Sequence, residues 1–530
     1  MKHFNILTRR DFLSYASKAG VAAAFSSLID IPLVAKRALA VNNQLGTNGK
    51  KLLFIFLRGA NDSLNSVIPI QDPAYATSRP TIGLAKDPAT DYSAIGQADI
   101  PTIAAADPTY SYANGIRLGN GMMALHPSLK FLSHLYNAGD LALVHRVGYP
   151  KQSRSHFDSQ NYWENGNPNN NASKDGIFYR TIIESGLANT APLTGVSFQS
   201  SLPLILRGSA AAMTNLSDPN TYGLLGLPNN TAGNLKADAA MLKEVGFPFP
   251  DKRNRDLLSL QYKNMLDTLD VFASINFSEA GNTFVDTAAT DGDTAPYYLF
   301  PTTNAKNGGY ALHANNAQKY VVSTGSYGFF DDLKAAALVL NKTDAIIAGT
   351  QLDGFDTHSN QGAAAGSHSN LQKSIGWSMY ALKQYFTQYA DKVNWNNLVV
   401  VTLSEFGRTT VENSDAGTDH AEAGVMFVAG GAVKGYNKGN TSGVFGGSTS
   451  DTVPWVAGST GSMFGASSRY LKRAYDYRSV LGKVIRDHLG ASQDQLNRII
   501  PGYTVTGESL KSGGVSTKDG TTIMGEPPVV

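Results

Sequence analysis

Several histidines and carboxylates stand in short polar segments directly beside apolar runs of the sequence. The candidates are Asp62, Asp356, His358, Glu405, Asp419 and His420. Carboxylate and imidazole groups bind zinc and harder divalent ions such as manganese or calcium, and this chain has no cysteine that could add a thiolate. We expect Asp356, His358 and His420 to bind a divalent metal ion, and Glu405 either to complete the shell or to orient it. The alternative is an ordinary hydrogen-bond network, because each residue alone also fits a structural role.

A second reactive cluster is Ser153-Arg-Ser-His156, at the start of a helical pattern. The free N–H groups and the dipole of a helix N-terminus stabilise an anionic substrate, and a nearby metal lowers the pKa of a bound alcohol. Ser155 is therefore a candidate nucleophile, with Arg154 as the side chain that binds the anion and His156 as a metal ligand or proton donor. The alternative is that Ser153 caps the helix and that the other side chains form structural hydrogen bonds.

Five apolar runs next to these segments predict buried strands. They are residues 51–57, 141–147, 344–350, 397–403 and 425–429. Between the third and fourth runs, Leu371, Ile375 and Met379 recur at helical spacing. This order predicts an α/β fold with a mainly parallel central sheet flanked by helices. Because sites in such sheets form outside the carboxyl ends of the strands, we expect the candidate residues to converge at one edge of the sheet.

The sequence predicts one main α/β domain over residues 41–500. It contains an insertion or cap at about 167–341, rich in Asn, Gly, Ala and Thr, which we expect to be largely helical. The main helix expected there is 251–275, in which apolar residues recur at steps of three and four. The glycine-rich residues 501–530 predict a loose C-terminal tail.

Residues 1–40 resemble a twin-arginine export signal. Arg9 and Arg10 precede a Phe-Leu pair, a modest apolar run follows, and Ala38-Leu-Ala40 is a small-x-small cleavage pattern. Asp30 ends the apolar run well short of the about 20 residues that a membrane span needs. We therefore expect the twin-arginine export machinery to be a partner, the mature chain to lack a stable membrane span, and its location to be periplasmic or extracellular.

The charge balance excludes one class of partner. Residues 1–40 hold six of the 44 Lys and Arg and two of the 42 Asp and Glu, which leaves 38 basic against 40 acidic side chains. A slightly acidic mature chain gives no reason to expect nucleic acid as a partner.

The polar segments resemble those of the DUF1501 family of exported bacterial proteins, in the same order and over nearly the whole mature chain. They are Leu57-Arg-Gly-Ala-Asn-Asp-Ser-Leu-Asn65, Ser153-Arg-Ser-His-Phe157, Gly354-Phe-Asp-Thr-His-Ser-Asn-Gln361, Ser404-Glu-Phe-Gly-Arg408 and Thr418-Asp-His420. The family in turn resembles the alkaline phosphatase and sulfatase superfamily, which implies an alkaline phosphatase-like fold. By this resemblance Asp356 and His358 correspond to the mid-chain metal-binding pair, and His420 to the late histidine ligand.

The chain also departs from the superfamily pattern. Arg58 stands where an aspartate is expected after the first strand, and Phe406 replaces the histidine of the turn that begins with Glu405. A two-metal site would therefore be reduced to one metal or lost. The resemblance implies an exported metal-dependent hydrolase of phosphate or sulfate esters or of related small anionic substrates. The alternative is a non-catalytic exported protein that keeps the fold and binds a ligand or an envelope partner.

Overall fold

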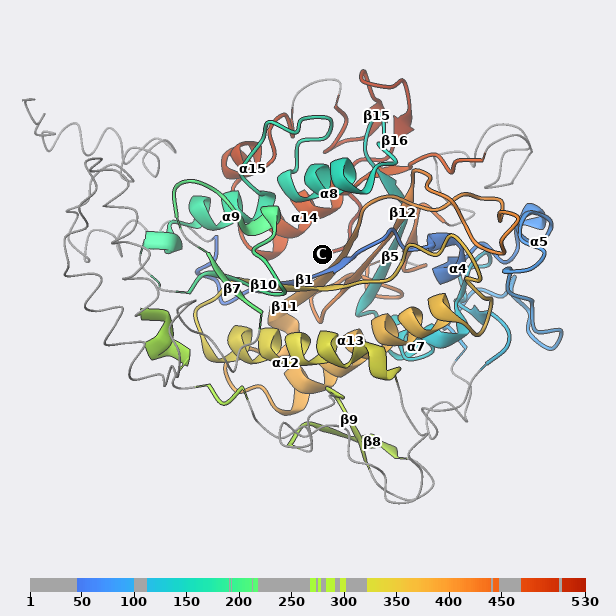
Figure 1. Cartoon of the computed structure of the whole chain (residues 1–530), viewed down its shortest axis with the longest axis horizontal. Coiled ribbons are helices and arrows are strands. Elements are labelled where there is room, and N and C mark those ends of the chain that lie inside the picture. The colour runs from blue at the N-terminus through green and yellow to red at the C-terminus, as the bar shows by residue number, and fades with distance from the viewer. Residues whose placement is uncertain are drawn as a thin grey trace, which may run out of the picture.

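A nine-stranded mixed sheet forms the centre of the molecule (Figure 1). The computed structural model describes residues 45–99, 112–189, 191, 193–211, 213–217, 267–272, 275–277, 283–290, 296–301, 322–439, 442–447, 469–504 and 508–530. The strands of the sheet are β1 (Lys51–Leu57), β5 (Leu141–Gly148), β6 (Gly195–Phe198), β7 (Thr214–Leu216), β10 (Ile347–Leu352), β11 (Leu398–Ser404), β12 (Gly424–Ala429), β13 (Val444–Phe445) and β14 (Tyr475–Asp476).

The spatial order of the strands is β13-β5-β12-β11-β1-β10-β6-β7, and β14 also pairs with β5. Among these strands all pairs are parallel except those that β12 makes with β11 and with β5. The predicted α/β class and the mainly parallel sheet are thereby confirmed, with one antiparallel strand that the sequence pattern did not reveal.

Helices cover both faces of the sheet, as Figure 1 shows. Their bounds are α4 (Ser63–Ser66), α5 (Pro73–Ser78), α7 (Leu132–Asn137), α8 (His156–Asn165), α9 (Ile177–Ser185), α12 (Tyr327–Lys342), α13 (Ser367–Gln388), α14 (Tyr477–Lys483) and α15 (Gln493–Ile499). Strand β1 explains the two layers, because its seven residues are all buried and alternate between faces. Leu53 and Ile55 join the hydrophobic core of α7, α12 and α13, whereas Phe54 and Phe56 join that of α8, α9, α14 and α15.

Short elements lie outside these layers. The strands are β2 (Val67–Ile68), β3 (Ile116–Arg117), β4 (Ala124–Leu125), β8 (Val285–Thr290), β9 (Pro296–Tyr298), β15 (Gly514–Val515) and β16 (Thr522–Ile523). Single 3₁₀ turns are η1 (Pro127–Leu129), η2 (Leu187–Asn189), η3 (Leu204–Leu206), η7 (Thr324–Ser326) and η8 (Trp395–Asn397), and η9 (Val484–His488) is a π-helical turn that continues α14.

Two predicted regions look different in the structure. Within 167–341, β6 and β7 belong to the central sheet, so residues 195–198 and 214–216 are part of the sheet and not of a cap over it. Of the helix expected at 251–275, residues 267–272 are helical, and most of the remainder lies outside the described residues.

The C-terminal residues, expected to be loose, pack against the body of the molecule. Leu510, Ile523 and Val529 are buried, and the backbone carbonyl of Val529 accepts a hydrogen bond from the N–H of Lys434. The tail is ordered because its few apolar residues reach the hydrophobic core beneath α14 and α15. Among the described helices, none has the length and apolar character that crossing a bilayer requires.

Candidate metal centre

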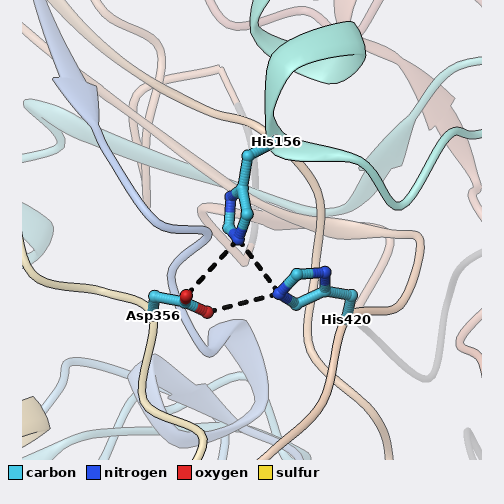
Figure 2. A group of neighbouring side chains, drawn as sticks. All are labelled: His156, Asp356 and His420. Atoms are coloured by element: carbon cyan, nitrogen blue, oxygen red, sulfur yellow. Dashed lines mark hydrogen bonds and ion pairs between the residues drawn. The ribbon is translucent and has the colours of Figure 1, made fainter.

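Three imidazoles and one carboxylate converge beyond the ends of β5, β10 and β11. We call His156, Asp356, His358 and His420 the ligand group. His420 Nε2 lies 3.0 Å from His156 Nε2, 2.9 Å from His358 Nε2 and 3.3 Å from Asp356 Oδ1. Figure 2 shows how His156, Asp356 and His420 point toward one another from three different segments.

The carboxylate of Asp356 faces all three imidazoles. Its Oδ1 lies 3.0 Å from His358 Nε2, and its Oδ2 lies 3.5 Å from His156 Nε2. A zinc ion with bonds of about 2.0–2.1 Å to tetrahedral ligands places those ligand atoms about 3.3–3.4 Å apart. The separations among His156, Asp356 and His420, 3.0–3.5 Å, are close to that spacing, so these three side chains present metal-binding atoms at the spacing of a first coordination shell, and His358 Nε2 adjoins Asp356 and His420.

The other ring nitrogen, Nδ1, of each histidine faces an oxygen acceptor. Nδ1 of His420 lies 2.8 Å from the carbonyl oxygen of Arg154, which can only accept a hydrogen bond. Nδ1 of His156 contacts Glu405 Oε2, and Nδ1 of His358 lies 3.3 Å from Asp419 Oδ1.

Because the acceptor of His420 Nδ1 is a carbonyl oxygen, this Nδ1 carries the proton and Nε2 of His420 presents a lone pair to the centre of the group. This is the arrangement in which histidine binds a metal, with the outer oxygen orienting the ring.

Charge distribution in the ligand group favours a cation. Burial raises the pKa of Asp356, but the hydrogen bond and the charge of Arg408 lower it, and the net pKa lies below the ordinary carboxyl value. Burial lowers the pKa of His420 below its ordinary value despite the hydrogen bond to Arg154. An ionised carboxylate, paired with Arg408, therefore stands beside a neutral imidazole, and both groups are in the protonation state in which they bind metal ions.

Glu405 orients His156 from the buried side of the group. Its side chain is fully buried at the end of β11, and its Oε1 accepts hydrogen bonds from the backbone N–H of Gly59 at 3.0 Å and from Gln160 Nε2 at 2.6 Å. These two donors and His156 account for both carboxylate oxygens. Glu405 was predicted either to complete the metal shell or to orient it, and these contacts correspond to the second role, because Glu405 orients His156.

Arg408 joins the loops that carry the ligand group. Its buried guanidinium donates to the carbonyls of Ala60 and Thr418 at 2.9 and 3.0 Å, and also contacts Asp356 Oδ1. The first of these loops requires glycine at position 59, because its φ is +100° and a Cβ there would stand 2.5 Å from the backbone nitrogen of Asp356. The loops after β1 and β10 therefore pack in direct backbone contact.

A second set of polar side chains lies under these loops and is buried throughout. We call it the buried network; it comprises Asn61, Asp62, Arg79, Gln361, His368 and Gln372. Asp62 accepts two hydrogen bonds from the guanidinium of Arg79, at 2.6 and 3.0 Å, and one from Gln361 Nε2 at 2.6 Å. Asp62, predicted as a metal ligand, thus has both oxygens occupied by protein donors and is not brought into the ligand group.

Gln361 connects the buried network to the ligand group. Its Oε1 accepts hydrogen bonds from the hydroxyls of Thr357, at 2.8 Å, and Thr418, at 2.9 Å. Thr357 stands between Asp356 and His358, and Thr418 precedes the segment that carries His420. One buried amide therefore holds the two ligand-bearing loops together.

The predicted cluster at Ser153–His156 divides into several roles. Ser155, not Ser153, is the N-cap of α8, and its Oγ accepts from the N–H of Asp158 at 3.4 Å. Arg154 is exposed, and its guanidinium lies 4.3 Å from the centre of the Tyr470 ring. His156 is the first residue of α8 and belongs to the ligand group, whereas Asp419 orients His358 and also pairs with Arg469.

Arg58 and Phe406, which stand where the resemblance predicts other residues, make defined contacts in the structure. Arg58 binds Glu164 at 2.8 Å and Gln351 at 3.1 Å. The buried Phe406 ring packs against the imidazoles of His156 and His420, at centroid distances of 4.9 and 4.7 Å. Phe406 therefore lines the ligand group with an apolar wall.

Sequence reasoning did not select Gln160, Gln361, Arg408 or Asn413 as site residues. Asn413 donates to Asp419 Oδ1 at 3.1 Å and to the carbonyl of His358 at 2.9 Å. Gln361 and Arg408 stood inside segments that were already singled out, and Gln160 lies three residues after another, so an amide or a guanidinium close to a predicted ligand was the available signal. Asn413 had no such signal, because it lies in a loop between two segments.

The comparisons with known proteins give one match. The model of the DUF1501 family, described as a protein of unknown function, matches residues 309–453. The matched stretch includes Asp356, His358, Glu405 and His420, and excludes His156. The search of curated proteins and the search of solved structures gave no match. The match over residues 309–453 supports the assignment of this chain to the DUF1501 family.

Proposed function

We propose that this chain is a divalent-metal-dependent hydrolase of phosphate or sulfate esters or of related anionic substrates. The observation that carries the proposal is the convergence of His156, Asp356 and His420, with His358 Nε2 beside Asp356 and His420. The proposal includes the alkaline phosphatase-like relationship, which the α/β class and the order of the polar segments support.

The donor set narrows the choice of metal. Three nitrogens and one carboxylate suit zinc, and manganese remains compatible, whereas calcium prefers shells made only of oxygen. A bound zinc ion would polarise an ester oxygen and lower the pKa of a coordinated water or alcohol.

The chain's own groups supply the remaining functions. The guanidinium of Arg154 and the first N–H groups of α8 bind the anionic part of the substrate beside the ligand group. Ser155 lies one residue before His156, and its hydroxyl is the candidate nucleophile. Glu405 keeps the proton on His156 Nδ1, so that Nε2 remains available to the metal.

Metal analysis tests the core of the proposal. Protein purified without chelator should contain about one zinc or manganese per chain, and should hydrolyse p-nitrophenyl phosphate or p-nitrophenyl sulfate. His156→Ala and His420→Ala should lose both metal and activity, whereas His134→Gln, a histidine in α7 outside the ligand group, should keep both. Absence of metal from active wild-type protein would overturn the proposal.

Ser155→Asn separates two roles of the serine. Asparagine caps helices as well as serine does but offers no hydroxyl. The variant should therefore retain stability and metal content and lose hydrolysis by at least about a thousandfold, which corresponds to about 4 kcal/mol in the barrier. Retained hydrolysis would assign the attack to water.

The second candidate function is a binding protein that keeps the fold without catalysis. The packing of Phe406 against two imidazoles and the pairing of Arg58 with Glu164 favour it, because these residues occupy positions where the superfamily places further metal ligands. Stoichiometric metal without hydrolysis of either ester would select this alternative.

Export by the twin-arginine route belongs to the same proposal and concerns residues outside the described part of the chain. Replacing Arg9 and Arg10 by lysine should leave the protein in the cytoplasm, as fractionation and the N-terminal sequence of the product would show. Unchanged export would contradict it.

A further inference from the structure

One large apolar side chain beside the ligand group is exposed to solvent. Phe157 directly follows His156 in α8, and its relative exposure is 83%. Among the described residues, the other large apolar side chains that are exposed are Ile95, Val411 and Val515, so Phe157 is the one aromatic ring in this class. Covering such a ring removes a large apolar surface from water, which is favourable for whatever covers it.

The start of α8 does not require an apolar residue at position 157. Ser155 is the N-cap, so Phe157 is the second helical residue. The apolar pair that often fixes the entry to a helix uses the residue before the N-cap and the fourth helical residue, which here are Arg154 and Ser159. In the part of the chain that the structure describes, Phe157 therefore has no role in the helix start or in the core that would call for an aromatic ring.

The flank of α8 that carries Phe157 faces the strand ends at the ligand group. Residues seven apart complete about two helical turns, so Phe157 and Glu164 lie on the same side of α8. Glu164 binds Arg58, which directly follows β1, at 2.8 Å. Gln160, three residues after Phe157, reaches Glu405 at the end of β11 at 2.6 Å. Because Phe157 stands in the first turn, next to a member of the ligand group, its ring lies at the rim of that group on the side of the loop after β1.

The ligand group is open to solvent, so a molecule bound there has a part that lies at the rim. The side chains of Asp356 and His358 are both nearly half exposed. The exposed Arg154 and the first turn of α8 offer a positive charge and N–H groups to an anionic part, whereas Phe157 offers an apolar ring a few residues away. This pair of surfaces matches a ligand with an anionic group at one end and an apolar group at the other.

We propose that Phe157 is a specificity-determining residue that contacts the alcohol part of the substrate, and that this alcohol is apolar, an alkyl or aryl group. The inference rests on the proposed function, which places the phosphate or sulfate group of the ester at the ligand group. The ring of Phe157 and the apolar alcohol both leave water when they meet. An ester of a small or polar alcohol gains no such contact.

Binding of phosphonates tests this contact without hydrolysis. Methylphosphonate, hexylphosphonate and phenylphosphonate carry the same anionic group and no ester bond, and titration calorimetry on protein purified without chelator compares their affinities. Hexylphosphonate, phenylphosphonate or both should bind at least about tenfold more tightly than methylphosphonate, the discrimination that one apolar contact provides. A preference for the hexyl compound alone identifies an alkyl alcohol, and a preference for the phenyl compound alone identifies an aryl alcohol.

Equal affinity for the three phosphonates, or no binding of any of them, would overturn the inference. Failure of the proposed hydrolysis is a separate result, because it appears as an absence of phosphate or sulfate release from the nitrophenyl esters. The phosphonate comparison keeps its meaning in that case.

Variants assign the preference to the ring. Phe157→Ala should lower the affinity of the preferred phosphonate relative to methylphosphonate about tenfold, with metal content per chain as in wild type. Phe157→Leu keeps an apolar side chain and should retain most of a preference for hexylphosphonate. Ile95→Ala removes an exposed apolar side chain outside the ligand group and is the matched control, with the wild-type ratio expected. The same ratio in Phe157→Ala as in this control would refute the assignment of Phe157.

Discussion

The ligand group and the buried network contain the same kinds of side chain, yet they differ in what each polar atom faces. In the buried network a carboxylate faces a guanidinium, with Asp62 and Arg79 both fully buried. In the ligand group, imidazole nitrogens and the carboxylate of Asp356 face each other at the surface, where the Asp356 side chain is 46% exposed. The two regions therefore differ in the orientation of their polar atoms and not in residue type. Of the two, the ligand group is the one whose acceptor atoms face a common point where a cation could bind.

The largest loss of folding stability is expected for a substitution in the buried network. Arg79→Met leaves the Asp62 carboxylate buried without its charge partner, and removing one partner of a buried pair costs about 3–5 kcal/mol. Urea unfolding should show this loss, and Asp62→Asn combined with Arg79→Met should recover a large part of it. Metal content per folded chain should not change, and a loss of metal in the folded fraction would mean that the two regions are not separable.

For substitutions in the ligand group, the loss of stability should depend on whether metal is bound. At a hundredfold excess of free metal over its dissociation constant, binding stabilises the folded chain by about 2.7 kcal/mol. EDTA should lower the thermal midpoint of wild type, and His420→Ala should show the lower midpoint with or without EDTA. An equal response of wild type and variant to chelator would contradict the assignment of His420.

Gln361→Leu tests the connection between the two regions. The substitution removes the acceptor of Thr357 and Thr418 and one donor to Asp62. Outer residues that orient ligands change metal affinity by about 10–100-fold, and we expect a loss in that range by competition with a chelator of known affinity. Gln388→Leu, at the exposed end of α13, serves as control; a drop in stability without any change in affinity would restrict Gln361 to a structural role.

Acid should destabilise the folded chain through a buried imidazole. Burial lowers the pKa of His126 to about 3, below an unfolded value of about 6.5. The unfolded chain therefore binds a proton that the folded chain refuses, so this stability is present above pH 6.5 and is lost as the pH falls toward 3, at about 1.4 kcal/mol per pH unit. His126→Asn keeps an acceptor for the N–H of Ser128, and urea midpoints between pH 7 and 4 should fall less steeply in this variant.

The smallest effect concerns the start of α8. Ser155→Ala removes the cap acceptor for the N–H of Asp158, a change that costs about 1 kcal/mol. Ser153→Ala should cost less, because Ser153 accepts only from the N–H of Ser155. Thermal midpoints of the two variants rank the serines, and a larger loss for Ser153→Ala would restore that residue as the cap.

Much of the fold could be predicted from the sequence, since five apolar runs marked strands of the central sheet. The short strands β6 and β7 could not, because three or four residues in a polar stretch carry no usable period. Asp356, His358 and His420 were selected because they stand at strand ends. The different environments of Asp62 and Asp356 were not predictable from the sequence. Asp62 is paired with Arg79, which lies 17 residues further along the chain and reaches Asp62 only in the folded structure.

The antiparallel strand β12 has a consequence for how metal binding depends on the sheet. It lies between β5 and β11, so without it the sheet consists of two separate parts, one built on β5 with β13 and β14 and the other running from β11 to β7. His156 follows the first part, Asp356 belongs to the second, and His420 directly precedes β12. A chain whose β12 has detached therefore lacks the complete ligand group, and amide hydrogens of β12 should exchange in parallel with the loss of bound metal.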